Sequence, residues 1–302
     1  MKQFIAAAML MAAGHCYANS PALYECIYSY RAAINDAEKP SSEESECILQ
    51  IGDDKSRFYD YVAFRLDSVS AIPGISNEVK EEFNTAYLKA DQYFEQTVIT
   101  DLSDNELTVF CDMAPDSYRY VQKLPLIDWK LSDDTDTICG YLCHKATGVY
   151  GGREWTVWYA DEIPTSFGPW KLSGLPGLVL KAIDSEEIHD FEAISFRNGS
   201  SEISEPKVPN VNSIKADKFI ERKNSYDKDP MGSIERESIT SLTVLPNKSL
   251  LVNGVRIRNH KSGFQPLEYS ESEIKKGIKT KQNKEPQTQG EIKVIGVGTM
   301  RK

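Results

Sequence analysis

Histidine is scarce in this sequence, and the common catalytic motifs are absent. Only four histidines occur in 302 residues, and His15 lies in the N-terminal apolar segment. Little material is left for a His-rich metal centre or for His-based acid–base chemistry, so we predict no metal and no cofactor. Gly-x-Ser-x-Gly, His-Glu-x-x-His, a P-loop and a strand-to-helix Gly-x-Gly-x-x-Gly are all missing. We therefore predict no catalytic residue, although a hydrolase built from Ser173, His144 and His189 is an alternative.

Positive charge and long apolar runs are also scarce. The 35 Lys and Arg residues against 45 Asp and Glu residues give a net charge of −10, so we predict no nucleic-acid partner. At 40% hydrophobic and 26% charged, the chain still holds enough apolar side chains for a buried core. After the N-terminal segment, no run reaches the roughly 20 apolar residues that a membrane-spanning helix needs. The mature chain is predicted to lack a transmembrane segment.

The N-terminal segment resembles a secretory signal peptide. A short positive region and the apolar residues 4–14 precede small residues at positions −3 and −1 of a cleavage site between Ala18 and Asn19. A lipid-modified cysteine would need a small residue before it, whereas His15 precedes Cys16. We expect residues 1–18 to be removed and the protein to be exported to a periplasmic or secreted location.

Five cysteines remain after this segment: Cys26, Cys47, Cys111, Cys139 and Cys143. An odd number leaves at least one thiol free or in an intermolecular bond. We predict a Cys26–Cys47 disulfide, because the two lie in adjacent predicted strands joined by a short polar connection. Cys111 has two alternative partners, Cys139 and Cys143. On one extended strand these two would lie about 13 Å apart, too far to bridge each other.

The apolar periodicity predicts an α+β fold dominated by antiparallel strands. Residues 23–34 and 47–51 predict two neighbouring strands. Loose helical spacing over residues 56–68, and a clearer stripe from Val79 to Phe94, predict two helices. Further strands are expected at 107–111, 118–122, 127–131, 139–149, 155–159, 177–183 and 189–196. We predict a curved or half-barrel-like sheet with one or two helices from about residues 56–96 packed on it.

Composition divides the chain into four parts. Residues 1–18 form the signal peptide, and residues 19–200 form a β-rich domain. Residues 201–269 form a C-terminal extension with a hairpin around Pro246. Residues 270–302 hold eight Lys and Arg residues and four Glu residues, which predicts a basic, disordered tail.

The segment between Trp158 and Leu178 is too rich in glycine and proline for a regular strand. Glycine permits a positive φ or a close backbone approach, and proline fixes φ at about −65°. We therefore predict a rigid, sharply turned loop. The residues that shape it are Gly168, Pro169, Gly174, Pro176 and Gly177.

An ordered set of motifs surrounds this loop. The set comprises Cys143-His144-Lys145, Gly152-Arg153, Trp158-Tyr159, Gly168-Pro169-Trp170-Lys171 and Gly174-Leu175-Pro176-Gly177-Leu178-Val179. In these residues the chain resembles the GLPGLI family, a Porphyromonas-type family of exported proteins that is named for the last of these motifs. The resemblance implies a secreted or periplasmic location. It carries over no catalytic residue, cofactor or substrate, because the family's biochemical function is unknown.

Aromatic and cationic side chains accompany the loop and have two compatible interpretations. They form either a recognition surface or a structural plug that closes the open end of the sheet. The candidate binding residues are Arg153, Trp158, Tyr159, Pro169, Trp170, Lys171, Leu175 and Pro176.

These predictions favour an exported, non-enzymatic cell-envelope protein that binds a peptide, a lipid or a partner protein through residues 158–178. Two alternatives stay open, a hydrolase-type enzyme and a structural component of an export or surface assembly. A small molecule that copurifies with the native protein would distinguish a binding protein from a structural component.

Overall fold

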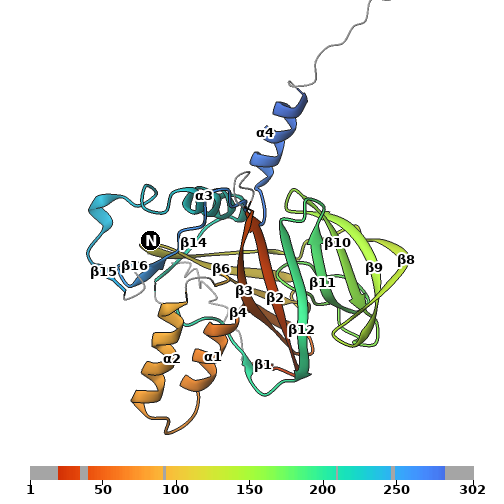
Figure 1. Cartoon of the computed structure of the whole chain (residues 1–302), viewed down its shortest axis with the longest axis horizontal. Helices are drawn as coiled ribbons and strands as arrows, with labels where there is room; N and C mark the ends of the chain where they lie inside the picture. Colours follow the sequence, from red (N-terminus) through yellow and green to blue (C-terminus); the bar gives the residue numbers. More distant parts are fainter. Residues whose placement is uncertain (1–19, 35–39, 91–92, 209, 246–248, 283–302) are drawn as a thin grey trace, which may run out of the picture.

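A curved sheet forms the body of the protein in the computed structural model (Figure 1). The structure describes residues 20–34, 40–90, 93–208, 210–245 and 249–282. The sheet has 12 strands in the order β14-β7-β6-β5-β4-β3-β2-β12-β11-β10-β9-β8. Neighbouring strands pair antiparallel except for β14 and β7, which are parallel. The predicted α+β fold with a large, curved, mainly antiparallel sheet is confirmed.

Two meanders, β2 to β7 and β8 to β12, make up most of this sheet and join where β2 pairs with β12. In chain order the strands are β2 (Tyr24–Ile34), β3 (Ser41–Ile51), β4 (Lys55–Asp60), β5 (Gln96–Asp101), β6 (Glu106–Met113), β7 (Asp116–Lys123), β8 (Lys130–Ile138), β9 (Tyr141–Tyr150), β10 (Arg153–Ala160), β11 (Leu178–Asp184), β12 (His189–Asn198) and β14 (Val211–Ser213). The short strands β1 (Ser20–Pro21) and β13 (Glu202–Ile203) pair with each other.

Alternating side chains give the sheet an inner, apolar face. Tyr30 in β2 and Phe191 in β12 stack with ring centroids 4.5 Å apart, and Phe94 meets the Tyr30 ring edge-on at 5.3 Å. Burying one such ring stabilises the fold by roughly 1.5–3 kcal/mol. The aromatic cluster therefore fixes the inner face at the place where β2 and β12 lie side by side.

The first predicted helix begins later than expected. Residues 55–60 form β4, and α1 spans Tyr61–Ser70 because the Asp60 side chain accepts a hydrogen bond from the Ala63 backbone N–H at 3.0 Å, which caps the helix. Assigning residues 56–60 to a helix was therefore wrong.

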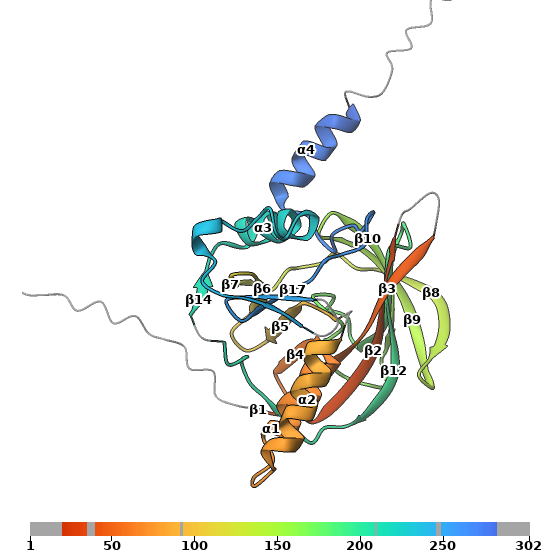
Figure 2. The ribbon, with the colours of Figure 1, turned by 60° about the vertical axis from the view of Figure 1, so that its left-hand side comes forward.

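The second helix, α2 (Asn77–Lys89), forms as predicted but does not lie on the sheet. No side chain of α2 is fully buried, and the helix packs against α1, which in turn contacts β3 and β4. Figure 2 shows the two helices projecting together from the sheet. The stripe from Val79 to Phe94 was expected to face the sheet, but only its last member, Phe94, enters the core, beyond the end of the helix.

The cysteines are all free within the described residues, and the predicted Cys26–Cys47 disulfide is wrong. Cys26 lies opposite Leu49, and Cys47 lies opposite Tyr28, so the two cysteines are diagonal neighbours. Diagonal Cα atoms lie roughly 7–8 Å apart, beyond the usual reach of a disulfide. Burial raises the pKa of the Cys26 thiol to about 12.

Cys139 and Cys143 do not share one strand as assumed. Cys139 has a φ of 52° and Gly140 a φ of 85°, and together they form the turn between β8 and β9. Cys111 is also free, so neither of its two predicted partners is bonded to it.

The C-terminal extension covers the inner face of the sheet. Helix α3 (Ala216–Lys228) is followed by the short helix η1 (Arg236–Ser238) and a sheet of β15 (Leu242–Val244), β16 (Leu250–Val252) and β17 (Val255–Ile257). The predicted hairpin is confirmed, and its turn residues 246–248 lie outside the described residues. Phe219, Val252 and Leu267 share one hydrophobic core with the large sheet.

After β17 the chain returns across the molecule. We refer to residues 258–270 as the crossing segment. Its backbone is held at Tyr269, whose N–H donates to the Gly151 carbonyl at 2.9 Å. Helix α4 (Glu271–Gln282) then occupies the first part of the predicted disordered tail, and residues 283–302 lie outside the described part of the chain. No described helix is long and apolar enough to cross a membrane.

Candidate functional site

The glycine- and proline-rich loop is folded back between β10 and β11. The Leu178 N–H donates to the Ile163 carbonyl at 3.1 Å, and the Gly174 N–H donates to the Ser166 carbonyl at 2.8 Å. A Cβ atom on Gly177 would overlap the Ala160 carbonyl, although the φ of Gly177 is not positive. Gly174 differs, because its φ of 98° favours glycine.

Most of the candidate binding residues in and around this loop are inside the protein. Arg153, Tyr159, Pro169, Trp170, Lys171 and Leu175 are buried, Trp158 is half-buried, and Pro176 is exposed. A recognition surface would place Trp170 near the surface, but only 1% of it is exposed. Its indole packs edge-on against Tyr150 and donates to Oε1 of Gln96 at 3.1 Å. This placement favours a structural plug over an exposed recognition surface for Trp170.

Lys171, the next residue, carries a buried charge. Its ammonium group contacts the carboxylate of Glu268 in the crossing segment and donates to the Tyr120 hydroxyl at 2.6 Å. Burial lowers the pKa of Lys171, and the negative charge of Glu268 opposes that change. The loop and the crossing segment are therefore joined by a buried ion pair.

Arg153 anchors the crossing segment at a second point. Its guanidinium donates to Asp184 at 2.5 Å and to the Pro266 carbonyl at 2.6 Å. Asp184 also accepts the backbone N–H groups of Ile188 and His189, at 2.6 and 3.0 Å. The hydrogen bonds of Arg153 therefore hold the crossing segment against β11, which is a structural role.

Trp158 lies on the opposite, outer face of the sheet. In register it stands between Lys145 of β9 and Lys181 of β11, and the Lys181 ammonium lies 5.7 Å from its ring. Of the candidate binding residues, Trp158 and Pro176 are the two that are not buried.

Replacing Trp170 with Phe should lower the free energy of unfolding by about 1–2 kcal/mol, because the Gln96 carbonyl oxygen loses its donor. Chemical denaturation measures this loss. A matched Trp158→Phe variant should change stability much less, since Trp158 is half-buried and its indole N–H has no described partner. Equal losses in the two variants would contradict the assignment of Trp170 to the core.

Ionised side chains from distant parts of the chain meet beneath the crossing segment. They are Glu43 of β3, Glu95 before β5, Lys223 and Asp227 of α3, and Arg258 and His260 of the crossing segment, and we refer to them as the His260 cluster. Three carboxylates face two permanent cations and one imidazole. Protonation of His260 therefore makes the cluster neutral.

His260 is held between the carboxylates. Its Nδ1 lies 2.8 Å from Glu43, and its Nε2 lies 3.1 Å from Glu95 and 3.7 Å from Asp227. The ring also stacks on Phe264, with centroids 3.6 Å apart. Burial alone lowers the pKa of His260, but the charge of Glu95 and hydrogen bonds to Asp227 and Glu43 raise it to about 10. The imidazole is therefore positively charged at neutral pH.

Glu43 receives several donors from the crossing segment. Nη2 of Arg258 and the backbone N–H of Lys261 each donate to its carboxylate at 2.7 Å. Burial alone raises the pKa of Glu43, but the hydrogen bond and charge of His260, together with Lys261 and Arg258, lower it to about 2. These bonds fasten the crossing segment to the start of β3.

Stability should peak near pH 6.5. His260, raised from 6.5 to about 10, stabilises the fold fully below pH 6.5, and this contribution is lost as the pH rises. His189 is buried and lies near Arg153, and both effects lower its pKa from 6.5 to about 3, so its contribution is lost as the pH falls through this range. Urea midpoints across pH measure the loss of stability on both sides of this maximum, the alkaline limb above pH 6.5 and the acid limb below it. His260→Gln should flatten the alkaline limb and His189→Gln the acid limb, whereas an unchanged alkaline limb in His260→Gln would contradict the account.

Glu95, Asp227 and His260 also have the side-chain types of a metal site, with ligand atoms within 4.8 Å of one another. However, the Lys223 ammonium donates to Glu95 at 2.8 Å and to Asp227 at 2.5 Å. A divalent cation would have to displace this ammonium and deprotonate His260. The residues present therefore do not fit a resident metal.

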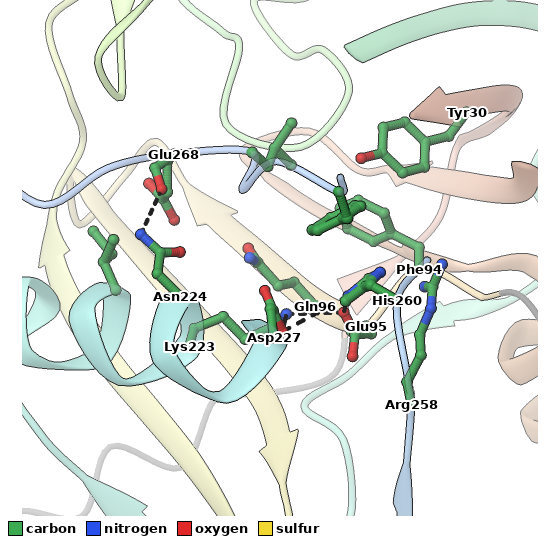
Figure 3. A pocket seen from close by; sticks show the side chains of 13 residues that line it. Tyr30, Phe94, Glu95, Gln96, Lys223, Asn224, Asp227, Arg258, His260 and Glu268 are labelled. Carbon is green, nitrogen blue, oxygen red and sulfur yellow. Dashed lines mark hydrogen bonds and ion pairs between the residues drawn. The ribbon is translucent and has the colours of Figure 1, made fainter. Parts of the chain in front are cut away.

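A pocket opens beside the His260 cluster, between β5, α3 and the crossing segment (Figure 3). Its inner space is about 40 Å³, and the figure reaches about 490 Å³ only when the open mouth is counted. The pocket can therefore hold one small chemical group, while the rest of a ligand would lie in the mouth. Its lining residues are Tyr30, Phe94, Glu95, Gln96, Ile220, Lys223, Asn224, Asp227, Arg258, His260, Phe264, Leu267 and Glu268.

Two carboxamides in this pocket have fixed orientations. The Gln96 oxygen accepts from Trp170, whose indole only donates, so the NH₂ group of Gln96 is the end left for the pocket. The Asn224 NH₂ group donates to the Glu268 carbonyl at 3.0 Å and to Glu273 at 2.9 Å, which leaves its oxygen for the pocket. Figure 3 shows the two carboxamides extending toward the same space. Neither free end has a hydrogen-bond partner among the described residues.

Sequence reasoning missed this pocket. Gln96, Asn224 and His260 belong to three segments that are far apart in the chain, and no local motif joins them. The residues of the alternative hydrolase, Ser173, His144 and His189, are not brought together in the described structure. His189 has hydrogen bonds with Tyr30 and Pro266, His144 lies 3.7 Å from Asp161, and neither histidine has a hydrogen bond to Ser173 in the described structure.

The chain matches a known family over a short part of its length. Residues 151–181 match a family described as "Protein of unknown function (Porph_ging)". The matched residues hold β10, the buried loop and the start of β11, including the hexapeptide from Gly174 to Val179. They leave α3 and the crossing segment outside. No curated protein matches the chain.

Solved structures give distant matches. Two crystal forms of PNGF-II are 17% identical, with TM-scores of 0.46 and 0.42, and cover 75% and 77% of this chain. The chain spans only 39% and 40% of those proteins. A putative outer membrane lipoprotein-sorting protein domain from Vibrio parahaemolyticus is 8% identical over 58% of this chain and 85% of that domain, with a TM-score of 0.19.

Proposed function

We propose that this chain is an exported binding protein of the cell envelope that binds one small group of a ligand in the pocket between β5, α3 and the crossing segment. The observation that carries the proposal is the pair of oriented carboxamides, Gln96 and Asn224, whose free ends share this pocket. Neither free end belongs to the buried polar atoms that lack a partner, so water or a ligand can reach both. A donor and an acceptor with fixed orientations in one accessible pocket are typical of a binding site.

This proposal moves the ligand away from the exposed surface first expected over residues 158–178. Trp170 and Lys171 take a supporting role instead. Trp170 orients Gln96, and Lys171 neutralises Glu268 at the other side of the pocket. The buried loop would thus shape the pocket from behind, which unites the two interpretations of the loop, plug and binding element.

The test is denaturing mass spectrometry of protein that was purified from the envelope under native conditions. We expect a small molecule to copurify with the wild-type protein and to be lost from an Ile220→Trp variant, whose larger side chain fills the pocket. The control variant is Trp158→Ala, which alters the outer face and should retain the molecule. Loss of the molecule from Trp158→Ala, with retention in Ile220→Trp, would instead place binding on the outer face.

Export is tested separately. We expect N-terminal sequencing of the exported protein to begin at Asn19, because the small residue Ala18 precedes the cleavage site. An intact Met1 on the exported protein would contradict the proposed leader.

A further inference from the structure

We infer that the pocket recognises its ligand through a neutral secondary amide, an inference that rests on the proposed function and names its ligand class. Gln96 offers an N–H donor, and Asn224 offers a carbonyl acceptor to the same space. A secondary amide has the complementary pair, because its C=O accepts and its N–H donates. An ester or a ketone would leave the Asn224 oxygen without a donor.

The charges around the pocket exclude an ionised ligand. Glu95 and Asp227 are neutralised by Lys223 and His260, and Glu268 is neutralised by Lys171. Arg258 is likewise paired with Glu43. An additional charge would enter this partly buried space without a counter-ion, which is costly. The ligand is therefore neutral where the pocket holds it.

The remaining walls are apolar. Phe94, Phe264, Ile220 and Leu267 line the pocket together with the carboxamides. Such walls suit the methyl or methylene groups that flank an amide, as in an acetamido group or the backbone of a small residue. Two sources in an envelope have this chemistry, a short peptide and an acetamido sugar.

The experiment uses matched pairs of probes on the full chain. N-acetylglucosamine is compared with glucose, and the capped residue N-acetylalanine N-methylamide is compared with its ester counterpart, methyl 2-acetoxypropanoate. Ligand-observed NMR titration measures the dissociation constants. We expect at least one amide probe to bind at least tenfold more tightly than its matched control, and the tighter of the two amide probes identifies the source.

A Gln96→Glu variant tests the contact itself. Its carboxylate can still accept from Trp170, but the NH₂ donor facing the pocket is gone. We expect amide binding to weaken at least tenfold in this variant. Thr156→Glu adds the same charge on the outer face and should leave binding unchanged. Trp170→Phe, which frees the Gln96 side chain to rotate, should weaken binding by a smaller factor.

The outcomes separate the ligand class from the proposed function. Equal binding of amides and matched controls, with pocket binding confirmed by loss in Ile220→Trp, would overturn the amide inference and leave the binding function standing. If no probe bound and the copurified molecule lacked an amide, the amide inference would likewise be overturned while the binding function would stand. Absence of both probe binding and a copurified molecule would overturn both.

Discussion

Gly177→Ala should destabilise the protein by about 3 kcal/mol or more, at the upper end of overpacking changes. The added Cβ atom would overlap the Ala160 carbonyl and lie 2.7 Å from the Asp161 nitrogen. Backbone atoms cannot rotate away as a flexible side chain can, so β10 or β11 would have to shift. Of the two reasons for glycine that the sequence suggests, a positive φ and a close backbone approach, the close backbone approach applies at Gly177.

Gly277→Ala is the matched control for this change. Gly277 lies in α4, and an added Cβ atom there would meet nothing within 4 Å. Because Ala is a better helix former, the control should be neutral or slightly stabilising. Urea denaturation of both variants measures the difference. Similar midpoints for Gly177→Ala and Gly277→Ala would refute the tight contact between the loop and β10.

Lys171→Met should lower the free energy of unfolding by about 3–5 kcal/mol, because it leaves the Glu268 carboxylate buried without its cation. Lys171 is fully buried, and only 5% of the Glu268 side chain is exposed. The double variant Lys171→Met with Glu268→Leu should recover most of the loss, since it removes both buried charges.

An exposed ion pair provides the comparison for Lys171. Lys275 and Glu271 lie 2.9 Å apart in α4, with 71% and 77% of their side chains exposed. Lys275→Met should have little effect on the urea midpoint, because solvent screens this pair. If the double variant at Lys171 and Glu268 were no more stable than Lys171→Met alone, the cost would not come from the unpaired charge.

The architecture was predictable because strand periodicity is a local signal. Alternation over residues 23–34 and most of the short β-rich runs after Glu106 correspond to strands of the large sheet. The strand expected at 127–131 overlaps β8 (Lys130–Ile138) at only two residues. The start of α1 was missed because Ser56–Asp60 has an apolar spacing that fits a helix or a buried strand. Pairing of β4 with β3 and β5 decides between the two, and that pairing is not local.

The environment of Trp170 was not predictable for a similar reason. Its loop sequence, rich in Gly and Pro, is typical of an exposed turn. Burial comes from partners at distant positions, Gln96 in β5 and Tyr150 at the end of β9. The pocket depends on even longer separations, because Arg258 meets Glu43 and Glu268 meets Lys171 only when the crossing segment returns over the sheet.

An experimental electron-density map of natively purified protein tests the central claim most directly. The account predicts density for a small molecule between the Gln96 amide nitrogen and the Asn224 carbonyl oxygen, with Trp170 still donating to Gln96. A pocket filled only by ordered water, with a bound molecule seated on the outer face beside Trp158, would contradict it.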